Sequence, residues 1–153
     1  ATDFAPELPV NQGHLIGKPL SEKQSRDADF GWQVAKQMGG MDIGQSITVK
    51  DGTVLAVEAV EGTDQCIERT GRLCRRGGWM LVKVSKPEQD MRFDVPTVGP
   101  NTVELVAKNG GNAIVIEADK TIMVERDTTL RLAAQHGITI VAFDQQAGVA
   151  KAA

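Results

Sequence analysis

The sequence predicts a single α/β domain with a mixed sheet, and three observations support this prediction. Short apolar runs typical of buried strands alternate along the chain with segments of helical periodicity. The dipeptide Asp51-Gly52 separates two such runs, which predicts a hairpin and therefore an antiparallel pair. The 153 residues are enough for one hydrophobic core. We expect a three-layer-like domain, with one hairpin in the sheet and helices packed on it.

The first helix has a clear start signal. Residues 1–20 contain three prolines and two glycines, so we expect an extended linker there. The sequence from Ser21 to Gln24 has the form of a capping box, in which Ser21 is the N-cap and Gln24 reaches back to it. Apolar residues then recur at helical spacing until Gly39-Gly40, where we expect the helix to end.

The remaining elements follow from the same signals. We expect strands at 43–50 and 53–58 on either side of the hairpin turn. Gly62 precedes a second helix, with Thr63 as its N-cap, that runs to about Cys74. Beyond it we expect a strand at 79–82, a helix capped by Asn101 or Thr102 and ending at 108, strands at 113–117 and 121–124, a helix from Asp127 to His136, a strand at 138–143, and a frayed tail at 144–153.

Composition narrows the function classes. The net charge is −3 and the longest basic tract is Arg75-Arg76, which argues against nucleic-acid binding. No apolar run approaches the roughly 20 residues of a membrane-spanning helix. Cys66 and Cys74 lie about 12 Å apart along one predicted helix, too far for a disulfide, so we expect two reduced thiols and a cytoplasmic location.

The segment at 83–97 is the main candidate site. It follows the predicted strand at 79–82, and its two prolines disfavour helix, so we expect a stiff loop. Asp90, Arg92 and Asp94 alternate in it and would project to one side of an extended chain. Together with Lys83, they can bind a phosphate, with or without a metal. The simpler alternative is a surface ion-pair network, worth about 0–1 kcal/mol per exposed pair.

A second candidate lies at residues 58–64, where a predicted strand meets a helix. Ligands of α/β folds gather at the carboxyl ends of strands, where helix N-termini present free N–H groups to anions. Thr63 and the amides after it can therefore hold a phosphate oxygen or a hydroxyl. The alternative is an ordinary helix cap with acidic residues near the positive helix end. Glu58 and Glu61 need partners if the end of the strand is buried.

Five motifs occur in this order along the chain: DIGQS at 42–46, VLAVEAVEGTD at 54–64, LVK at 81–83, KP at 86–87 and QDMRFDVPTVG at 89–99. Together they resemble the LpxI family of UDP-2,3-diacylglucosamine pyrophosphatases. The resemblance extends from about Pro6 to Phe143 and corresponds to the C-terminal catalytic half of those enzymes. Residues 1–20 would then be the linker from an N-terminal domain that this chain lacks.

The resemblance implies an activity and a setting. It implies hydrolysis of the pyrophosphate bond of UDP-2,3-diacylglucosamine to UMP and 2,3-diacylglucosamine 1-phosphate in lipid A biosynthesis, assisted by Mg²⁺. It also implies a lipid-linked UDP-sugar substrate, contact with the N-terminal domain, and transient contact with the cytoplasmic face of the inner membrane of a Gram-negative bacterium. We further expect a homodimer. The alternatives are another nucleotide-sugar or phosphate-ester hydrolase, and a non-catalytic module that binds a lipid or nucleotide.

The residue roles are hypotheses read through this resemblance. Asp94 is the residue expected nearest to the chemistry, as a magnesium ligand or as the group that orients water, with Asp90 and Glu61 as further carboxylate ligands of the metal. Arg92 and Lys83 are expected to stabilise negative charge. The expected substrate-binding residues are Glu61, Gly62, Thr63, Asp64, Lys86, Gln89 and Thr97.

Overall fold

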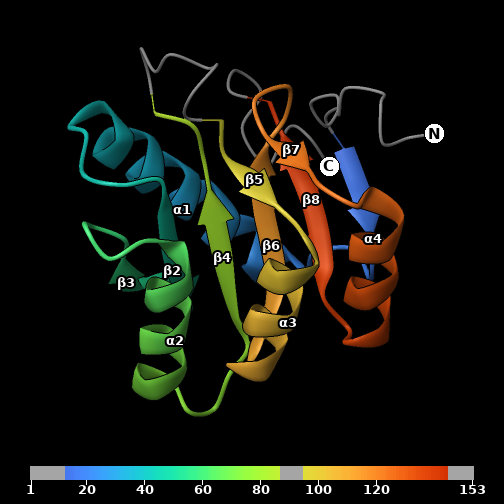
Figure 1. The fold of residues 1–153 in the computed structure, drawn as a ribbon. Coiled ribbons are helices and arrows are strands. Elements are labelled where there is room, and N and C mark those ends of the chain that lie inside the picture. The colour runs from blue at the N-terminus through green and yellow to red at the C-terminus, as the bar shows by residue number, and fades with distance from the viewer. Residues whose placement is uncertain (1–12, 87–94, 145–153) are drawn as a thin grey trace.

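The computed structural model describes residues 13–86 and 95–144. These residues form a mixed six-stranded sheet with strand order β1-β8-β6-β4-β2-β3 and a separate pair, β5-β7 (Figure 1). The elements are β1 Gly13–Ile16, α1 Glu22–Gly40, β2 Ser46–Lys50, β3 Thr53–Val57, α2 Thr63–Leu73, β4 Trp79–Lys83, β5 Thr97–Val98, α3 Pro100–Lys108, β6 Gly111–Glu117, β7 Ile122–Met123, α4 Arg126–Gln135 and β8 Thr139–Phe143.

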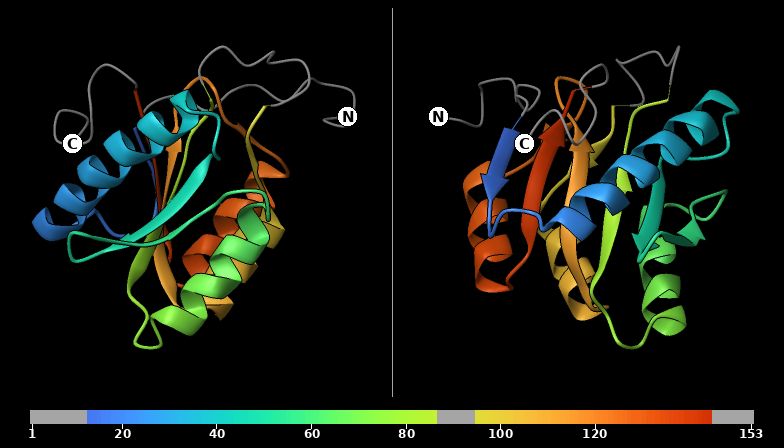
Figure 2. Two further views of the ribbon diagram at one scale, coloured as in Figure 1. Left: turned by 90° about the vertical axis from the view of Figure 1, so that its left-hand side faces the viewer. Right: turned by 180° about the vertical axis from the view of Figure 1, so that it is seen from behind.

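The sheet is mixed, as predicted. Strands β4, β6 and β8 are parallel to one another and occupy its centre. Strand β2 pairs antiparallel with β4 and with β3, and β1 pairs antiparallel with β8. Helix α1 covers one face, and α2, α3 and α4 cover the other, so the domain has three layers (Figure 2). The predicted fold class is confirmed.

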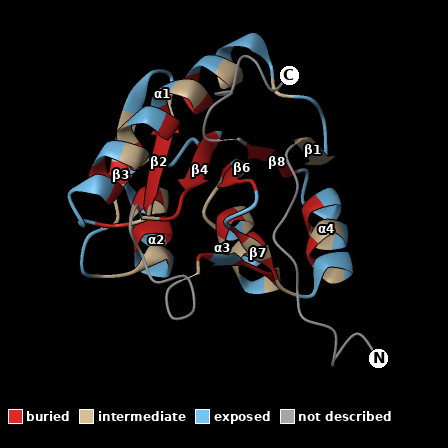
Figure 3. Cartoon of the chain, turned by 90° about the horizontal axis from the view of Figure 1, so that it is seen from above, coloured by how far each residue is buried: buried red, intermediate tan, exposed pale blue. Residues whose placement is uncertain are grey.

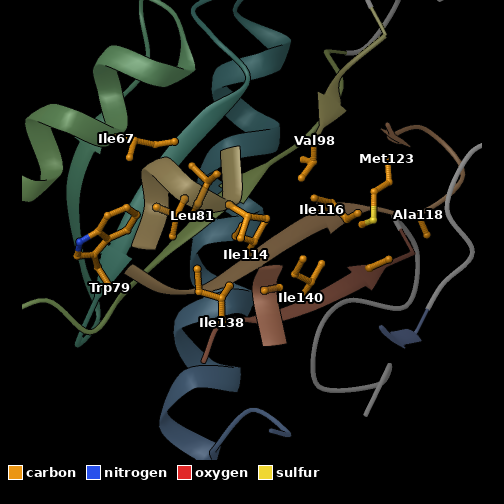
Figure 4. Close-up of a cluster of buried hydrophobic side chains, with 14 residues drawn as sticks. Ile67, Trp79, Leu81, Val98, Ile114, Ile116, Ala118, Met123, Ile138 and Ile140 are labelled. Atoms are coloured by element: carbon orange, nitrogen blue, oxygen red, sulfur yellow. The ribbon is translucent and has the colours of Figure 1, made fainter. Parts of the chain in front are cut away.

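Two hydrophobic clusters lie on the two faces of the sheet. The larger cluster joins the sheet to α2, α3 and α4, and Trp79, Leu81 and Ile114 are completely buried in it (Figure 4). The smaller cluster packs Trp32 and other α1 residues against the opposite face. Strands β2, β4, β6 and β8 are almost entirely buried, whereas the edge strands β1 and β3 and the outer sides of the helices are partly exposed (Figure 3). The nearly continuous apolar character of β4 and β6 follows from burial on both sides.

The predicted local signals are confirmed in the first half of the chain. Ser21 caps α1, and its hydroxyl accepts from the Gln24 amide while the Gln24 side chain accepts from the Ser21 amide. The hairpin turn has positive φ at both Asp51 and Gly52, which the right-handed twist of a hairpin favours. The sequence did not reveal that Asp27 of α1 holds this turn, because its carboxylate accepts from both turn amides at 3.0 and 2.7 Å.

The structure differs from the prediction at residues 13–16. We expected them in the extended linker, but they form the edge strand β1 beside β8. The pairing supplies hydrogen bonds to a sheet edge that would otherwise be open. The glycines and prolines of this segment give no sign of such a long-range pairing. The strand expected at 121–124 is present as β7, but it pairs with β5 outside the main sheet.

Three helix starts are also shifted from their expected positions. Gly62 is the N-cap of α2 in place of Thr63, and Gly99 is the N-cap of α3 in place of Asn101 or Thr102. Pro100 explains the second shift, because proline favours the first helical position. The N-cap of α4 is Glu125, two residues before the expected start at Asp127.

Candidate functional site

The candidate site lies where the parallel strands β4, β6 and β8 end. Their last residues are Lys83, Glu117 and Phe143, and all lie at the same edge of the sheet (Figure 1). The first turn of α2 lies close to this edge, and its amides carry partial positive charge. In α/β folds this edge is where ligands bind. The fold therefore directs attention to the groups around the end of β4.

Lys83 is the central cation of this edge. It is 9% exposed, and its Nζ donates a 2.8 Å hydrogen bond to the Thr97 carbonyl oxygen. Burial lowers the pKa of Lys83 below its ordinary value, and the nearby carboxylates of Glu58 and Asp64 oppose that shift. A cation in such surroundings attracts an anion more strongly than one on an exposed surface. The structure thus brings Lys83, Asp64 and Thr97 together.

Thr63 joins the same group through two hydroxyl contacts. Its Oγ1 donates to Glu58 Oε1 at 3.2 Å and lies 3.0 Å from the hydroxyl of Ser46. Ser46 is the strand partner of Lys83 across β2 and β4. The Thr63 hydroxyl thus serves as a bridge between β2 and the carboxylate of Glu58, the residue after β3, although Gly62 is the helix cap.

A close backbone approach holds Glu58 in this position. A Cβ atom on Gly44 would lie 2.0 Å from the Glu58 carbonyl oxygen, so only glycine fits there. The Glu58 carboxylate also accepts from the Gln45 amide at 3.3 Å. The sequence drew attention to Glu58 as a carboxylate needing partners, and the structure identifies those partners as Thr63 and Gln45.

Glu61 and Gly62 occupy the turn before α2. The Glu61 carboxylate accepts two hydrogen bonds from Arg69, at 3.1 and 2.6 Å, and one from the Ala59 amide. The hydrogen bonds from Arg69 lower the pKa of Glu61. Gly62 has φ 93°, a conformation that glycine adopts readily. In this arrangement the carboxylate of Glu61 serves the local structure of the turn.

Of the remaining predicted site residues, one lies in the described part of the chain and the others lie outside it. Lys86 lies just beyond β4, and its Nζ forms a 2.9 Å ion pair with Asp42, two residues after α1. The predicted residues that lie outside the described part of the chain are Gln89, Asp90, Arg92 and Asp94.

The expected metal site is not formed by the described residues alone. Within residues 13–86 and 95–144, no three His, Cys, Asp or Glu side chains gather in a way that could hold a metal ion. Glu61 is engaged by Arg69. The magnesium hypothesis therefore depends on Asp90 and Asp94.

A buried ionic network beside Lys83 was not predicted from the sequence. Glu117, at the end of β6, is completely buried and forms a 3.0 Å ion pair with Lys36 of α1. Its carboxylate also accepts from both the amide and the hydroxyl of Ser85. The available signal was a glutamate ending the apolar run at 113–116, since a charge there must be paired when the strand is buried.

Two comparisons relate the chain to known proteins. The family model described as the LpxI C-terminal domain matches residues 11–141. The chain is 36% identical over 148 residues to the UDP-2,3-diacylglucosamine pyrophosphatase LpxI of Caulobacter vibrioides. That match covers 92% of this chain and 52% of the relative, so the chain spans about half the length of the curated relative. Among the described helices, none has the length and apolar character needed to cross a membrane.

Proposed function

Because this chain belongs to the LpxI family and carries its C-terminal domain, we propose that the protein hydrolyses the pyrophosphate bond of UDP-2,3-diacylglucosamine. The products would be UMP and 2,3-diacylglucosamine 1-phosphate, in lipid A biosynthesis. The observation that carries the proposal is the 36% identity to a pyrophosphatase of that name across 92% of this chain. Since the relative is about twice as long, the activity is proposed for the full-length protein.

The groups around the end of β4 support this chemistry. The negative oxygens of a pyrophosphate repel a nucleophile, so a cation has to offset their charge. Lys83 supplies one from a largely buried position. The hydroxyl of Thr63 and the amides of the first turn of α2 offer hydrogen-bond donors nearby. We propose that Lys83 contacts the diphosphate, with Thr63, Asp64 and Thr97 at the edges of the binding site.

Carboxylates are proposed to direct the attacking water. Asp94 is the first candidate and Asp90 the second, with Arg92 as a further cation. Gln89, Lys86, Glu61 and Gly62 remain proposed substrate contacts, and Glu61 remains a proposed metal ligand with the two aspartates. We also propose that turnover requires a divalent cation, with Mg²⁺ as the expected ion because it prefers oxygen ligands.

The substrate suggests the setting in which the protein works. Two acyl chains hold UDP-2,3-diacylglucosamine in a membrane, while the UDP group is polar. We therefore propose transient contact with the cytoplasmic face of the inner membrane of a Gram-negative bacterium. An N-terminal domain of the full-length protein and a second copy of the protein, forming a homodimer, are the other proposed partners.

The test is UMP release by the purified full-length protein. We expect release from UDP-2,3-diacylglucosamine in the presence of Mg²⁺, loss of release after chelation with EDTA, and recovery when Mg²⁺ is restored. UDP-glucosamine without acyl chains is the matched control substrate. Equal hydrolysis of both substrates would instead indicate a general nucleotide-sugar hydrolase, and no hydrolysis of either would contradict the proposal.

A variant tests the role of Asp94 separately. Asp94→Asn keeps the size of the side chain and removes its charge. We expect the folded variant to lose nearly all turnover. Turnover close to that of the wild-type protein would reject Asp94 as the principal carboxylate and leave the family's reaction to be assigned to other residues.

A further inference from the structure

The carboxylate of Glu117 accepts hydrogen bonds from two residues that lie far apart in the sequence, Lys36 and Ser85. Its Oε1 accepts from the Ser85 amide at 2.9 Å, from the Ser85 hydroxyl at 3.0 Å and from Lys36 Nζ at 3.1 Å. Its Oε2 accepts from Lys36 Nζ at 3.0 Å. The carboxylate is completely buried. It therefore joins three separate parts of the chain: α1, the end of β6 and the segment after β4.

A buried ion pair is weak evidence for a role in stability. The cost of removing both charges from water offsets much of their attraction, and apolar replacements of similar volume are often neutral or stabilising. Lys36 also carries a 3.3 Å hydrogen bond to the Ser85 carbonyl oxygen and lies 5.8 Å from the ring centroid of Trp32. Both charged residues thus contact Ser85, which links the ion pair to the segment that follows β4.

Ser85 lies where the chain leaves the sheet. Strand β4 ends at Lys83, and the Val84 amide still donates to the Gln45 carbonyl oxygen on the β2 side. The next amide, that of Ser85, turns to the other side and donates to Glu117. The carboxylate thus replaces the strand partner that Ser85 lacks, two residues from the cation of the candidate site.

We propose that Glu117 is a positioning residue for the hydrolysis: through Ser85 it fixes the direction in which the chain leaves β4 beside Lys83. This inference depends on the proposed function, in which Lys83 contacts the diphosphate. Fixing a backbone next to a reacting group matters because a displacement of about 1 Å can cost roughly 100-fold in rate. Lys36 holds the Glu117 carboxylate in place through their ion pair.

The first test is Glu117→Gln in the full-length protein. The amide keeps the shape of the side chain, but it loses the charge that attracts Lys36. Its Nε2 would also place a donor where Oε2 accepts from Lys36 Nζ, so the oxygen that accepts from Ser85 is no longer held in place. We expect kcat to fall roughly 10-fold to 100-fold, while KM changes by less than about threefold. This is the range expected for a residue that orients the groups of a site without contacting the ligand itself. A kcat within about twofold of the wild-type value would overturn the inference.

A paired variant separates positioning from stability. In Lys36→Met with Glu117→Met, both charges are replaced by apolar side chains of similar length, so the unfolding free energy should match or exceed that of Glu117→Gln. The positioning role predicts that kcat stays low, because methionine offers no oxygen to accept from the Ser85 amide and hydroxyl. Recovery of kcat together with stability would show a structural role only and would overturn the inference.

Asp27→Asn is the matched control. Asp27 is also a buried carboxylate that accepts from two backbone amides, but it holds the hairpin turn at the opposite edge of the sheet. We expect it to lower the melting temperature with kcat unchanged within about twofold. If Asp27→Asn lost as much kcat as Glu117→Gln, the loss of any buried carboxylate that binds backbone amides would slow turnover. That result would overturn the specific role of Glu117.

Hydrogen exchange tests the inference without an activity assay. In Glu117→Gln we expect the Ser85 amide to exchange at least about 10-fold faster, while amides in the middle of β6 keep their protection. Unchanged protection of Ser85 would overturn the inference. If the wild-type protein releases no UMP, the proposed function fails, and this exchange measurement alone then decides whether Glu117 fixes the chain after β4.

Discussion

The hydroxyl groups of Ser46 and Thr63 lie 3.0 Å apart, which joins the start of β2 to the first turn of α2. The Thr63 hydroxyl also donates to Glu58, and Ser46 is the strand partner of Lys83. An antiparallel strand therefore contributes to an edge that is otherwise formed by parallel strand ends. Through this contact the 58–64 motif and the end of β4 lie together in one candidate site.

Replacing Thr63 by valine tests the bridge. The variant keeps the side-chain volume but leaves the Glu58 carboxylate and Ser46 without the hydroxyl partner. We expect a loss of about 1–3 kcal/mol in the unfolding free energy, the usual cost of an unpaired polar group in a partly buried place. We also expect UMP release to fall roughly 10-fold, since Glu58 lies beside Lys83.

Thr63→Ser is the control for this prediction, because it retains the hydroxyl. It should stay within about threefold of the wild-type rate. Chemical denaturation and initial-rate measurements check both variants. A valine variant with wild-type stability and rate would show that the bridge between Ser46, Thr63 and Glu58 contributes to neither stability nor turnover.

The lowered pKa of Lys83 predicts opposite pH trends for activity and stability. Burial holds this pKa below 10.5, its ordinary value. Between the folded and unfolded pKa values, the unfolded chain binds more protons, so the contribution of Lys83 to the unfolding free energy rises with pH. Over the same range the amine loses its charge, so UMP release should fall as pH rises toward 10.5.

Lys83→Met supplies the reference for both trends. The difference in unfolding free energy between the wild-type protein and this variant should shift in favour of the wild type as pH rises. Equilibrium unfolding at several pH values measures it. A difference that does not change with pH, or that moves the other way, would contradict the buried position of the Lys83 ammonium.

The thiol of Cys66 should be protected in the folded protein. Cys66 is completely buried, and burial raises the pKa of its thiol to about 12. The thiolate is the reactive form, so iodoacetamide at pH 8 should leave Cys66 unmodified in the native protein and modify it in urea. Peptide mass spectrometry reads the labelling of this position directly. Labelling of Cys66 in the native state at the rate seen in urea would contradict the packing of α2 on the sheet.

The sequence predicted most of the fold because its local signals agreed with one another. The capping box at Ser21 and Gln24 and the hairpin at Asp51-Gly52 depend only on neighbouring residues, and both are present. Strand β1 was missed because its pairing with β8 joins residues more than 120 positions apart. Local composition marked that segment as a linker, and only the long-range pairing reveals a strand.

Some residues of the candidate site could also be predicted from the sequence, and others could not. Lys83 and Thr63 could be selected from their places at a strand end and a helix start. The partners of Glu117 could not, because Lys36, Ser85 and Glu117 come from three distant segments and meet only in the folded domain. The sequence also suggested Thr63 as the cap of α2, whereas Gly62 is the cap and the Thr63 hydroxyl turns toward Ser46 and Glu58.

The most direct test compares Lys83→Met with Lys50→Met in the UMP-release assay. Both lysines donate to a backbone carbonyl oxygen, Lys83 to Thr97 at 2.8 Å and Lys50 to Gly77 at 2.6 Å, but Lys50 does so at the opposite edge of the sheet. If the end of β4 holds the diphosphate, Lys83→Met should lower kcat/KM by roughly 100-fold or more, and Lys50→Met should stay within about threefold. Wild-type kcat/KM in Lys83→Met, or an equal loss in both variants, would contradict the account.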